Sequence, residues 1–211
     1  MHAATRIIRE EHAALAAMLR SIILLLDQHR RERSQPDFRA LRAMLFYVDE
    51  FPEQRHHRKE TELLFPKLRA RTPLSRKQLD RLDADHARGE HQIRELEHAL
   101  LAFEMLGESR RAAFEQAAQR YVDFYLTHMA LEEREILPLA ESVLTEADWT
   151  ELDEAFSANR DPLAGHHLPE PDYQALFTHI VGLVPAPLGL GDPARRPSDA
   201  PPSHARLKEH S

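Results

Sequence analysis

Apolar residues recur at spacings of three and four through most of the first 145 residues, which is the pattern of amphipathic helices. The pattern predicts four long helices, at residues 4–30, 37–70, about 75–106 and about 110–144. One histidine belongs to the first apolar stripe, which consists of Ile8, His12, Leu15, Leu19, Ile22 and Leu26. Because short connectors separate the helices, we expect an all-α fold, an up-down-up-down four-helix bundle.

A proline interrupts the second predicted helix. Pro52 falls within its apolar pattern, and a proline inside a helix removes a hydrogen bond and clashes with the preceding turn. We therefore expect a kink or a break at this point, shortly before His56.

The composition divides the chain into three parts. Residues 1–145 form the predicted bundle. Residues 146–184 follow as a helical extension that we expect to pack on the bundle, with short helices from Thr145 to about Phe156 and from Tyr173 to Val184. Residues 185–211 are dominated by proline, glycine and charge, so we expect a flexible, disordered tail.

A motif of histidine and glutamate occurs twice, with a shift of 72 residues. His56 is followed by Glu60 and His128 by Glu132, and a proline stands six residues after each glutamate. Residues four apart lie on one face of a helix, one turn from each other. Each copy therefore presents an imidazole and a carboxylate in the same direction, which suits a metal ion.

The repeat extends upstream to two acid–histidine pairs. In Glu11-His12 the histidine lies 44 residues before His56, and in Asp85-His86 it lies 42 residues before His128. Each half therefore contains an acid–histidine pair, a long gap and the second motif. Histidines at matching places on four helices would bury several polar groups for no structural gain, which favours a metal site.

The composition excludes cysteine-based metal sites and argues against one class of partner. The 211 residues include six glycines and no cysteine, and 42% are hydrophobic and 30% charged, as is typical of a soluble globular protein. Without cysteine, the chain can hold no thiolate metal site, disulfide or iron–sulfur cluster. The net charge of −7 argues against nucleic acid as a general partner.

The N-terminal region lacks the basic and then apolar pattern of a signal peptide. The longest apolar run near it, Ile22 to Leu26, is far too short to cross a membrane. We therefore expect a cytoplasmic protein without a membrane partner. The sequence leaves the oligomeric state open.

The predicted metal site consists of six residues: His12, His56, Glu60, His86, His128 and Glu132. Bundle cores can hold di-iron sites built from carboxylates and histidines of facing helices, and two metals about 3.5–4 Å apart can share bridging carboxylates. In this interpretation Glu60 and Glu132 bridge two non-haem iron ions, and each iron takes two histidines. At least one coordination position then stays open for a small ligand. Manganese or zinc would suit the same donors.

The segments around these residues resemble bacterial hemerythrin-like proteins of the HHE cation-binding type. The resemblance covers residues 4–145, and it is carried by Glu11-His12, His56 to Glu60 with Leu64-Phe65-Pro66, Asp85-His86 with Gly89, and His128 to Pro138. It implies a four-helix bundle with a non-haem di-iron centre that binds dioxygen, nitric oxide or a related small ligand.

Two acids leave the ligand set open. Oxygen-carrying hemerythrins, which the chain resembles, have a second histidine four residues after the first on the third helix, where this chain has Glu90. Glu90 is therefore a candidate ligand, a partner for His86 or a surface acid. On the last helix, oxygen carriers use an acid five residues after the histidine, which is Glu133 here, and the cluster-repair branch uses the acid four residues after. The internal repeat favours Glu132.

Helical geometry also predicts the positions of two neighbours of the motifs. His57 lies about 100° from His56 around an ideal helix, so we expect it on the surface. Tyr125 lies one turn before His128 on the same face, where it either packs or donates a hydrogen bond to the site.

The leading hypothesis is a binding module that binds or senses dioxygen or nitric oxide. One alternative is a di-iron enzyme that acts as a peroxidase, in nitric oxide detoxification or in iron–sulfur cluster repair. Cluster-repair relatives usually carry cysteine, which this chain lacks. The other alternative is a protein for iron storage or delivery.

Overall fold

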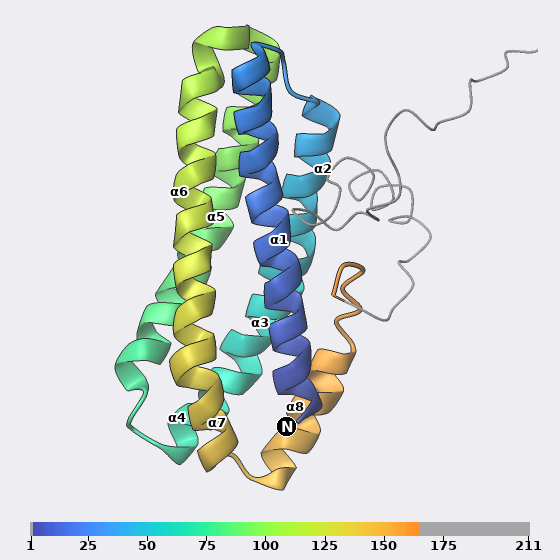
Figure 1. The fold of residues 1–211 in the computed structure, drawn as a ribbon. Coiled ribbons are helices and arrows are strands. Elements are labelled where there is room, and N and C mark those ends of the chain that lie inside the picture. Colours follow the sequence, from blue (N-terminus) through green and yellow to red (C-terminus); the bar gives the residue numbers. More distant parts are fainter. Residues whose placement is uncertain (1, 165–211) are drawn as a thin grey trace, which may run out of the picture.

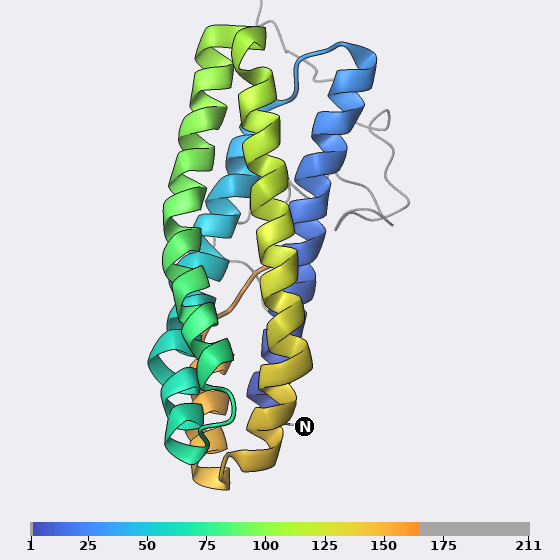
Figure 2. The ribbon, with the colours of Figure 1, turned by 90° about the vertical axis from the view of Figure 1, so that its left-hand side faces the viewer.

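The computed structural model describes residues 2–164, and in this range all the regular structure is helical. The helices form a bundle of four columns, and Figure 1 shows that successive columns run alternately up and down. The first column is α1 (Ala3–Glu32) and the third is α5 (Arg76–Leu106). Figure 2 shows the same columns side by side from a second direction. The predicted all-α bundle is confirmed.

The second and fourth columns are each built from consecutive helical segments. The second contains α2 (Phe38–Val48), a π-helical stretch (Asp49–His56), α3 (His57–Lys59), another π-helical stretch (Glu60–Leu64) and α4 (Phe65–Arg71). The fourth follows a 3-10 turn (Gly107–Arg110) and contains α6 (Arg111–Leu131), a π-helical stretch (Glu132–Ile136) and α7 (Leu137–Val143). A shorter helix, α8 (Glu146–Ser157), comes next.

Local sequence explains where several helices begin and end. The Asp37 side chain accepts a hydrogen bond of 3.0 Å from the Ala40 amide and so caps the start of α2. α5 ends at Gly107, whose φ of 76° favours a residue without Cβ. Thr145 and Asp148 form a capping box at the start of α8.

Prolines coincide with wide π-helical turns in both copies of the repeated motif. Pro66 and Pro138 each follow a π-helical stretch that begins at the repeated glutamate. Proline lacks an amide hydrogen and clashes with the carbonyl four residues earlier, so a wider turn relieves a conflict that a regular α-helix would contain. Pro52 lies in a further π-helical stretch, and the second column continues through it without a break.

The interior consists of two apolar clusters with a polar layer between them. On α1 the smaller cluster includes Ile8 and the larger one begins at Leu15. Glu11 and His12 lie between these positions and are buried. Because buried polar groups are costly without partners, this layer is the part of the core whose composition demands an explanation.

α8 packs against the start of α1. The Asp153 carboxylate accepts a hydrogen bond of 2.7 Å from the Ala4 amide, and the Trp149 ring stacks on His2 with centroids 4.2 Å apart. Trp149 and Phe156 belong to the smaller apolar cluster. α8 therefore covers the end of the bundle where α1 begins, on the side of the polar layer that the smaller apolar cluster occupies.

Two of the predicted segments belong to residues that the structure does not describe. The second helix of the extension, from Tyr173 to Val184, and the tail at residues 185–211 lie outside the described part of the chain. Within residues 2–164, no helix has both the length and the apolar character that crossing a bilayer requires.

Two neighbouring leucines of α5 test the packing of the larger cluster. Leu100 is 1% exposed and Leu101 is 51% exposed. Leu100→Ala should lower the free energy of unfolding by about 2–5 kcal/mol because it leaves a cavity. Leu101→Ala, the matched control, should change it by no more than about 0.5 kcal/mol. Urea unfolding followed by circular dichroism measures both, and equal losses would contradict this packing.

Candidate metal centre

Four histidines, one from each column, turn their Nε2 atoms into the polar layer: His12, His56, His86 and His128. The Nε2 atoms of His12 and His56 are 3.2 Å apart, and those of His86 and His128 are 3.1 Å apart. All four side chains are buried. The histidines therefore form two pairs, and each pair joins the two columns of one half of the repeat.

Glu60 lies between the two pairs. Its Oε1 atom is 2.8 Å from Nε2 of His56, and its Oε2 atom is 3.3 Å from Nε2 of His86. Each oxygen of one carboxylate therefore faces a different pair. Glu132 approaches from the fourth column, with Oε2 3.4 Å from Nε2 of His12. Both glutamates are fully buried.

The acid of each acid–histidine pair contacts a histidine of the next column. Glu11 Oε2 lies 2.6 Å from Nδ1 of His56, and Asp85 Oδ2 lies 3.8 Å from Nδ1 of His128. Glu11 also accepts a hydrogen bond of 2.9 Å from the side-chain amide of Asn159, just beyond α8. An acceptor at Nδ1 orients an imidazole and leaves its Nε2 lone pair free for a metal.

The residue five positions after each motif histidine contacts one of the remaining rings. Thr61 Oγ1 lies 2.8 Å from Nδ1 of His86, and Glu133 Oε1 lies 3.0 Å from Nδ1 of His12. The repeat therefore places the outer partners of the histidines as well as the histidines themselves. Thr61 and Glu133 occupy the same repeat position but differ in charge.

Burial and neighbouring charges act on these groups in opposite directions. Burial lowers the pKa of His12, but Glu132 and Glu133 outweigh it and raise this pKa to about 9. Burial, reinforced by the charge of Glu60, raises the pKa of Glu132 to about 7. Burial also opposes ionisation of Glu60, but the adjacent His56 and His86 bring its pKa well below the ordinary value. In the metal-free protein, protons take the place of cations.

The donor set fits a pair of metal ions. The carboxylate oxygens of Glu60 and Glu132 are buried without a hydrogen bond of good geometry. Such charges are costly in a core unless a cation compensates them. Among the described residues, Glu60 belongs to two groups whose ligand atoms lie within 4.8 Å of one another: His12, His56, Glu60 and Glu132, and His57, Glu60, His86 and His128. Imidazole and carboxylate suit iron, manganese and zinc.

Glu90 lies outside both groups, whereas the six residues expected to bind metal all meet in the polar layer. The Glu90 side chain is 54% exposed and its carboxylate is 4.0 Å from the guanidinium of Arg94. The inward face of α5 is formed by His86, Gly89 and Ile93, all buried, so Glu90 falls at the rim of that face. The structure therefore gives no contact that would make Glu90 a ligand.

The expectation that His57 lies on the surface is wrong. Its side chain is 2% exposed, and its ring stacks on His86 with centroids 4.4 Å apart. The second column contacts α1 on the side of His56 and α5 on the side of His57. The roughly 100° that separate His56 and His57 around the helix axis therefore lie between two faces that are both buried. Tyr125 is also buried, and its hydroxyl donates a hydrogen bond to Glu53.

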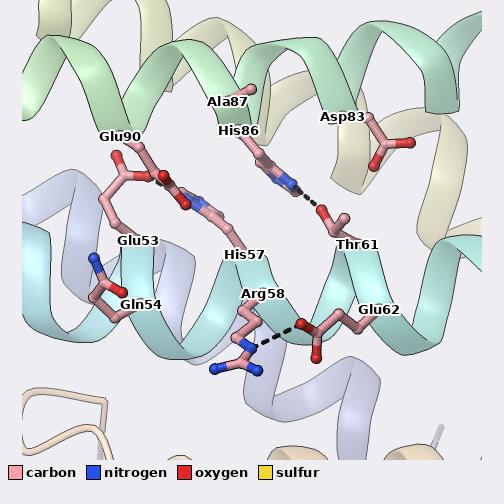
Figure 3. A pocket seen from close by; sticks show the side chains of 10 residues that line it. All are labelled: Glu53, Gln54, His57, Arg58, Thr61, Glu62, Asp83, His86, Ala87 and Glu90. Atoms are coloured by element: carbon pink, nitrogen blue, oxygen red, sulfur yellow. Dashed lines mark hydrogen bonds and ion pairs between the residues drawn. The ribbon is translucent and has the colours of Figure 1, made fainter.

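A cavity of about 450 Å³ opens beside the second histidine pair. Figure 3 shows that His57 and His86 lie at this cavity, with Thr61 beside His86 and Glu90 on the side of α5. The cavity gives a small molecule a route from the surface toward the polar layer.

The sequence matches the family model described as hemerythrin HHE cation binding domain over residues 3–140. The match spans more than half of the chain, and the chain belongs to this family. No curated protein and no solved structure matches the chain. Membership of a cation-binding family agrees with the two buried groups of histidine and glutamate, whose ligand atoms lie close enough together to hold metal ions.

Metal uptake should release protons. His12, with a pKa of about 9, is protonated at neutral pH, and Glu132, with a pKa of about 7, is partly protonated. Both must lose their protons to bind a metal, so affinity for Co²⁺ should rise as the pH is raised from about 6 to about 8. Calorimetric titration in two buffers with different ionisation enthalpies measures the released protons. Identical binding enthalpies in both buffers would contradict this assignment.

Proposed function

We propose that this protein is a non-haem di-iron protein that binds or senses dioxygen or nitric oxide. The observation that carries the proposal is the position of Glu60, whose two oxygens face two different imidazole pairs. In the proposed centre, His12 and His56 hold one iron and His86 and His128 hold the other. Glu60 bridges them, because its carboxylate already spans the two positions.

Glu132 supplies the second bridge in this proposal. It enters from the column opposite Glu60, and its oxygens are buried without a hydrogen bond of good geometry. Two imidazoles and two bridging oxygens leave each iron short of six ligands. Ferrous ions held in this way would offer open coordination positions to dioxygen or nitric oxide, and they would supply the electrons that reduction of bound dioxygen requires.

The surrounding residues suit a ligand-binding role. The apolar clusters on both sides of the layer limit the access of bulk water, and the cavity beside His57 and His86 admits small molecules from one side. The carboxylate acceptors at Nδ1 of His12 and His56 keep these two rings in place whether or not a ligand is bound.

These contacts favour a permanent centre over iron storage or delivery. All six proposed ligands are buried, so a chelator has little access to the metals. The enzymatic alternative uses the same irons. Turnover of peroxide or nitric oxide above that of a His56→Ala variant would establish an enzyme, and binding without turnover would support the binding module.

The proposal predicts an iron-to-chain ratio near two in protein purified from iron-replete cells. His56→Ala and His86→Ala each remove a ligand from a different iron, so each should lower the ratio to one or less. The control is His91→Ala, because His91 is exposed on α5 and pairs with Glu95. Elemental analysis measures the ratio. A wild-type ratio near zero, with no other metal present, would refute the di-iron centre.

The ferrous protein should bind nitric oxide and show a new absorption band in the visible region. The zinc-loaded protein is the control, because zinc is redox-inactive and should show no such band. Anaerobic titration followed by absorption spectroscopy measures the saturation point, expected at one or two molecules of nitric oxide per pair of irons. A spectrum that nitric oxide leaves unchanged in a fully iron-loaded sample would refute diatomic ligand binding.

A further inference from the structure

His57 has one ring nitrogen that is occupied and one that is free. Nδ1 lies 3.1 Å from the Glu53 carboxylate, while Nε2 is buried and has no hydrogen-bond partner. The ring is held between two others, stacked on His86 at 14° and parallel to Tyr125 at 2° with centroids 5.3 Å apart. A neutral imidazole whose Nδ1 carries the proton has a lone pair on Nε2, and here no donor satisfies that lone pair.

The free nitrogen lies beside the second histidine pair. His57, Glu60, His86 and His128 offer ligand atoms that all lie within 4.8 Å of one another. Glu60 bridges the two proposed metal positions, so this group defines the surroundings of the second metal. The first group offers two imidazoles and two carboxylates to a metal, and the second offers three imidazoles and the shared carboxylate.

We propose that His57 is a fifth imidazole ligand of the centre and binds the same metal as His86 and His128. This inference rests on the proposed di-metal centre and makes that centre asymmetric. The second metal then has the more nitrogen-rich set of ligands, and it lies on the side of the cavity.

Glu53 is the positioning residue for this ligand. Its Oε1 atom accepts hydrogen bonds from the hydroxyls of Tyr121, at 2.8 Å, and of Tyr125. These two donors leave Oε2 to accept the Nδ1 proton of His57. The proton on Nδ1 selects the tautomer whose Nε2 lone pair is available to a metal.

The same residues break the internal repeat. By the shift of 72, the counterpart of Glu53 is Tyr125 and that of His57 is Met129. The second half of the repeat therefore has neither a carboxylate at the position of Glu53 nor an imidazole at the position of His57. The repeat is symmetric in its first four histidines and departs from symmetry at the group around His57.

Gly89 is another position at which the internal repeat is broken. A Cβ atom at this position would lie 1.7 Å from the Tyr125 hydroxyl oxygen and 2.9 Å from Glu53 Oε1. The corresponding residue of α1, 74 positions earlier, is Leu15, which packs in the apolar core. Only a glycine on α5 leaves space for the tyrosine and the carboxylate that hold His57.

The test is a titration of the metal-free full-length chain with Co²⁺, whose visible spectrum reports the ligands of each site. The wild-type chain should bind two Co²⁺. His57→Ala should weaken the second binding step by more than about 100-fold, since loss of an outer partner alone costs about 10–100-fold. Glu53→Gln should fall in that smaller range. Imidazole added to His57→Ala should restore the wild-type spectrum, because the cavity reaches the vacated position.

His57→Phe separates coordination from packing. It keeps an aromatic ring between His86 and Tyr125 but has no nitrogen, so without metal it should unfold at a higher temperature than His57→Ala and still lose the second Co²⁺. The control is His91→Ala on the exposed face of α5. X-ray absorption of the wild-type Co²⁺ form should show five imidazoles shared by two metals, and it needs no variant.

The outcomes separate this inference from the di-metal proposal. Two tightly bound Co²⁺ ions in both His57 variants, with four imidazoles in the wild-type spectrum, would overturn the role of His57 and leave the di-metal centre intact. Failure of the wild-type chain to bind Co²⁺ or iron would instead overturn the di-metal centre itself.

Discussion

The structure depends on the burial of the Glu60 carboxylate at the centre of the bundle. A buried charge is tolerated only where opposite charge or strong hydrogen bonds compensate it. Here the compensation comes from His56 on the same column and from His86 on α5. The surroundings of the carboxylate suit this requirement: apolar clusters lie on both sides of the layer, and Glu11 and Glu133 contact the outer nitrogens of His56 and His12.

The duplicated sequence produces a polar layer in which side chains of neighbouring columns contact one another. In each acid–histidine pair, the acid contacts the histidine of the next column, as Glu11 does with His56 and Asp85 with His128. The histidine of the pair contacts a glutamate of the other neighbouring column. Each column therefore depends on its neighbours to hold its ligands in place. The repeated glutamate and proline also share a π-helical turn in both copies. A wide turn at this place changes the direction of the side chains that follow, which links the proline to the geometry of the site.

Contacts outside the matched family region also hold the site. Asn159, beyond α8, donates to Glu11, which in turn contacts His56. The ammonium group of Lys59 donates to the Ala155 carbonyl and to the Asn159 side chain. The segment after residue 140 thus belongs to the support of the centre, and the end of α8 acts on a proposed ligand through a single intermediate carboxylate.

The sequence by itself determined the four helices and the positions of the six central residues, because helical periodicity and an internal repeat are local properties of the chain. It also favoured Glu132 over Glu133, and the structure places Glu132 inside the layer and Glu133 against the outer nitrogen of His12. Only the tertiary structure determined that the His57 side chain is buried and that the Glu90 side chain is exposed. A helix with neighbours on two sides buries more than one face, so rotation about a single axis misplaced His57. Likewise, the direction of Glu90 depends on how α5 is turned toward the core, which no spacing within the helix specifies.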